Sequence, residues 1–75
     1  MNLPKFQLEF ILTTFNADPA AIRNALVEFG MELEINPSGA SGKDFLVHII
    51  SEDPTMVFDV CAQFGRIVSV KVEEG

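Results

Sequence analysis

Apolar and polar side chains alternate along several short segments of the chain, a period of two that is typical of β-strands. From residue 6 to 13, phenylalanine and leucine at the even positions alternate with mostly polar side chains at the odd ones. Shorter alternations recur over residues 31–35 and 67–72, and residues 45–50 are apolar everywhere except at His48. The pattern predicts four strands. It places residues 45–50 at the centre of the sheet, because a strand covered on both faces carries few polar side chains.

Two further segments show the spacing of an amphipathic helix, with apolar residues at i, i+3, i+4 and i+7. These apolar stripes are Ile22, Ala25, Leu26 and Phe29 in the first segment, and Val57, Val60, Cys61 and Phe64 in the second. Each segment opens with Asp-Pro, at Asp18 and Asp53, which supplies an N-cap oxygen and a first helical residue without an N–H group. We expect the helices to end at Gly30 and Gly65, in the left-handed conformation that often closes a helix.

The chain repeats itself with a shift of 35 positions. Asp18-Pro19 then coincides with Asp53-Pro54, and Phe29-Gly30 with Phe64-Gly65. Such a repeat indicates two copies of one strand–helix–strand unit. We therefore predict an α+β, ferredoxin-like βαββαβ two-layer sandwich, formed by internal duplication of a 35-residue unit. Right-handed crossovers give an antiparallel sheet of order 4-1-3-2, with both helices on one face, in a single domain spanning residues 1–75.

Composition narrows the classes of function. With 11 acidic and 5 scattered basic residues, the net charge is −6, which argues against binding to nucleic acid or to anionic membranes. One cysteine allows no internal disulfide and suits a reducing compartment. Because no apolar run approaches 18 residues and no basic region precedes the first apolar residues, we expect a cytoplasmic protein.

The sequence offers little material for catalysis. His48 is the single histidine, and it is expected on the sheet face away from the helices, where an isolated histidine seldom has a chemical role. Cys61 falls on the apolar stripe of the second helix, where a thiol acts as a small hydrophobe. No Cys-x-x-Cys motif or His–Cys cluster suggests a metal site. We therefore predict a protein that is not an enzyme and has no metal or cofactor.

Three stretches of the chain together resemble an ACT domain. They read Leu12-Thr-Thr-Phe-Asn-Ala-Asp-Pro-Ala-Ala-Ile22, Phe29-Gly-Met-Glu-Leu-Glu-Ile35 and Phe64-Gly-Arg-Ile-Val-Ser-Val-Lys-Val72. In that family the turn after the first strand reads Asp-x-Pro-Gly and binds small effectors, often amino acids, between paired domains. The resemblance implies an effector site at Asn16, Ala17, Asp18 and Ala20. The repeat supports another interpretation, in which Asp18 only caps a helix as Asp53 does.

The strand alternation also assigns side chains to the sheet face away from the helices. This face is apolar in its middle and acidic along one edge, at Glu32 and Glu34. An exposed apolar patch on a small protein usually marks a contact surface. The residues predicted to form it are Ile11, Leu46, His48, Ile50, Ile67 and Ser69. Since so small a domain has a modest core, we expect a homo-oligomer, with a dimer as its simplest form.

Two modes of self-association and two functions stay open. The last strand, residues 67–72, could pair with its counterpart edge to edge, which we favour, or the sheet faces could pack together. The first function is a stand-alone, non-catalytic ACT-like regulatory module that senses a small metabolite. The second is a module that binds a protein partner through the sheet face and takes no small ligand.

Overall fold

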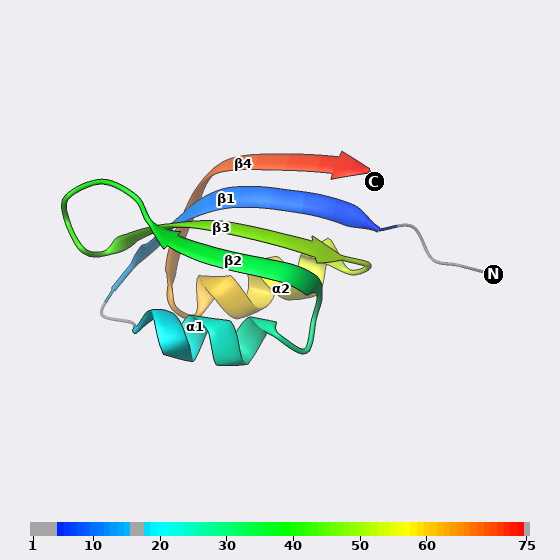
Figure 1. The fold of residues 1–75 in the computed structure, drawn as a ribbon, viewed down its shortest axis with the longest axis horizontal. Coiled ribbons are helices and arrows are strands. Elements are labelled where there is room, and N and C mark those ends of the chain that lie inside the picture. Colours follow the sequence, from blue (N-terminus) through cyan, green and yellow to red (C-terminus); the bar gives the residue numbers. More distant parts are fainter. Residues whose placement is uncertain (1–4, 16–17, 75) are drawn as a thin grey trace.

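The structure is a computed structural model that describes residues 5–15 and 18–74. Its elements, in chain order, are β1 (Phe6–Thr14), α1 (Pro19–Leu26), β2 (Met31–Pro37), β3 (Asp44–Ser51), α2 (Pro54–Ala62) and β4 (Gly65–Glu74). All strand pairings are antiparallel, and both helices lie under one face of the sheet (Figure 1). The strand order is β2-β3-β1-β4, which is 4-1-3-2 when read from the β4 edge. The α+β class is confirmed, and the arrangement is consistent with the predicted ferredoxin-like sandwich.

The core lies between the sheet and the helices, as the alternation predicts. Its buried hydrophobic residues are Leu8, Phe10, Leu12, Ile22, Leu26, Phe45, Val47, Ile49, Val57 and Cys61. The ring of Phe10 from β1 meets that of Phe58 from α2 edge to face, with centroids 5.4 Å apart. Each large side chain buried in this way contributes about 1.5–3 kcal/mol.

The helix starts are confirmed, and the predicted helix ends are wrong. The Asp18 carboxylate accepts a 2.9 Å hydrogen bond from the Ala20 N–H, and that of Asp53 accepts one of 3.2 Å from the Met56 N–H. However, α1 ends at Leu26, and neither Gly30 nor Gly65 adopts a positive φ. The two glycines therefore do not close the helices in the left-handed conformation.

Gly30 and Gly65 are explained by close backbone contacts. A Cβ at Gly65 would meet the backbone of Thr13 and lie 2.7 Å from the Cα of Thr14. A Cβ at Gly30 would meet the carbonyl oxygen of Ile50 and lie 2.7 Å from a side-chain carbon of Ile49. Each glycine thus lets the chain enter an edge strand close beside its neighbour.

Each edge strand contains one extra residue that shifts its register. In β4, Val68 pairs with Ile11 and Lys71 with Glu9, so three residues of β4 span two of β1, and Ser69 between them has φ 55°. In β2 the shift lies between residues 31 and 34, where Glu32 has φ 53°. These are β-bulges, which interrupt the alternation of side chains between the two faces.

The bulges correct two predictions of side-chain direction. Ile67 pairs with the buried Leu12 and packs against the core, so its predicted place on the opposite face is wrong. Val68 lies there instead, beside Ile11. The alternation that puts Glu32 and Glu34 on the face away from the helices also points Met31 toward the helices. In the structure, Met31 instead pairs with Ile50 on the other face.

Candidate functional site

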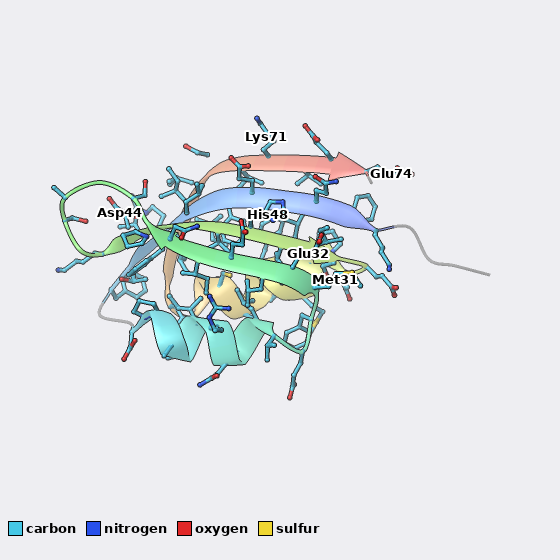
Figure 2. All side chains as sticks on the ribbon, viewed as in Figure 1. Met31, Glu32, Asp44, His48, Lys71 and Glu74 are labelled. Atoms are coloured by element: carbon cyan, nitrogen blue, oxygen red, sulfur yellow. The ribbon has the colours of Figure 1, made fainter. Side chains whose placement is uncertain are left out.

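We call the sheet face away from the helices the open face. A row of ionisable side chains crosses it from one edge strand to the other: Glu34 on β2, His48 on β3, Glu9 on β1 and Lys71 on β4. Consecutive members are direct cross-strand partners. Figure 2 shows Lys71 projecting from β4 on the side away from both helices. We call this set the charged row; it carries negative charge at the β2 edge and positive charge at the β4 edge.

Apolar side chains flank the charged row on both sides. Toward the β2–β3 loop, the neighbouring row runs Asn36, Leu46, Ile11 and Val68. Toward the chain termini, the next row runs Met31, Ile50, Gln7 and Glu73. Leu46 and Val68 are each 36% exposed and Met31 is 48% exposed, which is high for side chains of this kind. The open face therefore presents a charged band between two partly apolar bands.

The predicted contact residues are brought together only in part. Ile11, Leu46, His48 and Ile50 lie on the open face, whereas Ile67 does not. Ser69 sits in the β4 bulge, where it is exposed. Their role in a contact stays a prediction.

Sequence reasoning missed Val68 and Met31 as members of this face. Both are displaced from their expected side by a bulge in their own strand. The adjacent apolar pair Ile67-Val68 is the one signal in the sequence, since strict alternation would place a polar residue at one of these positions. Such a pair does not say which member faces the core, so the pattern alone could not decide.

Within the described part of the chain, two shallow hollows bear on binding. One lies on the open face and is lined by Gln7, Glu9, His48, Lys71 and Glu73. The other lies at the end of the sheet where α1 leads into β2 and β3 leads into α2; Ser51, Glu52 and Asp53 form one wall. The first hollow overlaps the charged row and mixes both signs of charge.

The predicted effector site is described only at its helical end. Asn16 and Ala17 lie outside the described residues, while Asp18 and Ala20 are exposed at the start of α1. The Asp18 carboxylate already accepts the Ala20 N–H, a group that an effector carboxylate could otherwise bind. Because Asp53 caps α2 in a comparable way, the contacts of Asp18 match those of a helix cap. Effector binding here stays a prediction.

The two candidate reactive side chains differ in setting. Cys61 is fully buried on α2, and this burial raises the pKa of its thiol from the ordinary value of 9.0 to about 12. Since the thiolate is the nucleophile, such a thiol is inert at neutral pH. His48 is half-buried on the open face between Glu34 and Glu9. Over residues 5–15 and 18–74, no three His, Cys, Asp or Glu side chains are placed to hold a metal ion.

Comparison with known proteins identifies no family. Neither a scan against protein-family models nor a search of curated proteins finds a match to this chain. Among the described residues, no helix has both the length and the apolar character needed to cross a membrane. The functional argument therefore rests on the geometry of the open face and on the resemblance of the sequence to ACT domains.

Proposed function

We propose that this protein is a non-catalytic ACT-like regulatory module of the cytoplasm, ferredoxin-like in fold and built from a duplicated 35-residue unit. It works by self-association and by binding a small metabolite such as an amino acid. The observation that carries the proposal is the open face, where apolar side chains of β2, β3 and β4 stay exposed beside the charged row. An exposed surface of this kind on a small domain supports a binding role.

The self-association half of the proposal is tested by sedimentation equilibrium of the wild-type protein across the micromolar range. We expect a concentration-dependent increase in mass toward a dimer. A protein that stays monomeric up to about 1 mM, a Kd worth only about 4 kcal/mol, contradicts it.

The effector half is tested by thermal shift with individual amino acids. A ligand that binds only the folded state at about 100 times its Kd adds about 2.7 kcal/mol to the free energy of unfolding. We expect Asp18→Ala to abolish the ligand-induced shift and Asp53→Ala, its counterpart in the second half, to leave it intact. Equal shifts in both variants remove Asp18 from the site.

The second candidate is a protein-interaction module that uses the open face and takes no small ligand. The observation that favours it is the hydrogen bond from the Ala20 N–H to Asp18, a contact typical of a helix N-cap. Absence of any shift across the amino acids, with self-association retained, selects this candidate over the first.

A further inference from the structure

The proposed function leaves open which surface joins two copies, and the edge strands are poor candidates. Both β2 and β4 carry a bulge with a residue at positive φ, Glu32 in one and Ser69 in the other. A bulge breaks the regular row of N–H and C=O groups that a second strand needs, and proteins use this device to block edge pairing. The edge contact favoured by the sequence thus loses its main support, and the open face takes its place.

One two-fold symmetry operation brings the charged rows of two copies together with opposite charges facing each other. When two open faces meet about a two-fold axis parallel to the strands, β2 lies over β4 of the second copy, and β3 over β1. Glu34 then faces Lys71 of the second copy, and His48 faces its Glu9. Symmetry makes each of these contacts twice.

The other in-plane axis, perpendicular to the strands through the charged row, gives the opposite result. It places each strand over its own counterpart, so Glu34 faces Glu34 and Glu9 faces Glu9. Like charges held opposite each other disfavour an interface. The order of charges along the row therefore selects the axis parallel to the strands.

Of the two flanking rows, the one toward the β2–β3 loop fits the same axis; in the other row, Ile50 faces Gln7 and Met31 faces Glu73 of the second copy. Leu46 of one copy faces Ile11 of the other in the row beside the charged row, and symmetry repeats this contact.

The three rows above and a fourth through Thr13 and Asp44 lie about 6.8 Å apart. With four strands at about 4.8 Å, they give each open face a footprint of roughly 500 Å². Two such faces bury roughly 1,000 Å², near the lower limit for a specific interface.

We infer that two copies of this chain pair through their open faces about a two-fold axis parallel to the strands, with Glu34 of each copy against Lys71 of the other. The inference rests on the proposed self-association and specifies its surface and symmetry. Aligned packing of two twisted sheets is a standard arrangement.

The test exploits the distance between Glu34 and Lys71 within one chain. They lie on opposite edge strands with β3 and β1 between them, about 14 Å apart at about 4.8 Å per strand. They cannot form an ion pair within one copy. Any coupling between them therefore reports contact between copies.

The experiment is sedimentation equilibrium on Glu34→Lys, on Lys71→Glu, on their equimolar mixture and on the double variant. Each single variant places like charges at both contacts, and we expect its dimer to weaken about tenfold or more. In the mixture, one copy carries two lysines and the other two glutamates, so the heterodimer regains both attractions. The double variant regains them as a homodimer, and we expect both to return to within about threefold of wild type.

Two matched controls separate the effect of a charge at the interface from the effect of the protein's net charge. Arg23→Glu and Glu28→Lys make the same changes in net charge at exposed positions outside the open face. We expect both controls to dimerise like the wild type, and circular dichroism shows whether each variant is folded. If Glu34→Lys and Lys71→Glu weaken the dimer no more than these controls do, the inferred interface is wrong.

The outcomes also distinguish the inference from the proposed function. A wild-type dimer whose charge variants are not rescued by mixing overturns the face-to-face arrangement and leaves self-association standing. A wild-type protein that stays monomeric overturns both.

Discussion

The hydroxyl of Ser51 donates a 2.6 Å hydrogen bond to the carbonyl oxygen of Phe29, joining the end of β3 to the turn that leads into β2. The same hydroxyl accepts a 3.0 Å hydrogen bond from the Asp53 N–H at the start of α2. Ser51 is only 2% exposed, so water cannot replace these contacts. One buried side chain thus joins the turn before β2 to the start of α2.

We predict that Ser51→Ala lowers the free energy of unfolding by about 1–3 kcal/mol, because two partly buried backbone groups lose their hydrogen-bond partner. Urea unfolding followed by circular dichroism measures the change. Ser41→Ala is the matched control, since the Ser41 hydroxyl accepts only an exposed N–H, that of Lys43. Equal effects of the two substitutions would show that the buried hydrogen bonds do not matter.

A second prediction concerns Gly65, which has no room for a Cβ beside Thr13. We expect Gly65→Ala to cost about 3 kcal/mol or more, because the obstacle is backbone and cannot rotate away. Gly42→Ala serves as the comparison: its Cβ meets open space and only the φ of +77° is unfavourable, at about 1 kcal/mol. If denaturant melts give Gly42→Ala the larger loss, the close-approach explanation fails.

The sequence predicts those features of the fold that depend on contacts between residues close together in the chain. The caps at Asp18 and Asp53 were predicted correctly because an N-cap hydrogen bond involves residues two or three positions apart. The reason for Gly65 was missed, since its obstacle, Thr13, is distant in sequence. The sequence shows that both halves carry a glycine at this position. It does not show the close backbone contact that requires each glycine.

The open face was predicted completely in its two regular central strands and only in part in its bulged edge strands. Ile11 and Leu46 follow strict alternation in the two central strands and were placed correctly. Ile67 was placed on the wrong face because the β4 bulge resets the register, and a bulge depends on pairing with β1 rather than on local sequence. The candidate site could therefore be predicted at its centre and at Glu34, but not at Val68 and Met31 on the edge strands.

The third prediction concerns the two helix caps. We expect Asp18→Ala and Asp53→Ala each to lower the free energy of unfolding by about 1 kcal/mol, because each removes an oxygen that accepts a first-turn N–H. Chemical unfolding without added ligand measures both. Replacement by asparagine, which keeps an acceptor oxygen, should restore most of the loss; a variant unaffected by the alanine change would show that its cap contributes nothing.

The fourth prediction concerns alkaline stability. An exposed thiol in the unfolded chain ionises near 9.0, whereas burial raises the pKa of Cys61 in the folded protein to about 12. Above pH 9.0 the unfolded state therefore binds fewer protons, and the free energy of unfolding falls as pH rises toward 12, by at most about 1.4 kcal/mol per pH unit. Below pH 9.0 the thiol is protonated in both states, so it does not change the free energy of unfolding with pH.

The measurement is urea unfolding at several pH values, with Cys61→Ala as the control. The chain has no tyrosine, so no phenol contributes in this range, and the lysines are common to both proteins. We expect the slope of stability against pH to be smaller in the variant. Identical slopes, or rapid reaction of the folded wild type with a thiol reagent at pH 7, would contradict the burial of Cys61.

The last prediction separates the open face from the rest of the surface. Leu46 and Met56 are similarly exposed, at 36% and 40%, but Leu46 lies on the open face and Met56 in the first turn of α2. We expect Leu46→Glu to abolish self-association, because it places a carboxylate opposite Ile11 of the second copy without a partner. Met56→Glu adds the same charge, and near a helix N-terminus that charge is favourable, so it should leave the dimer intact. Sedimentation equilibrium compares the two. If both variants dimerise like the wild type, the open face is not the contact surface, and if both are monomeric, net charge rather than position controls association.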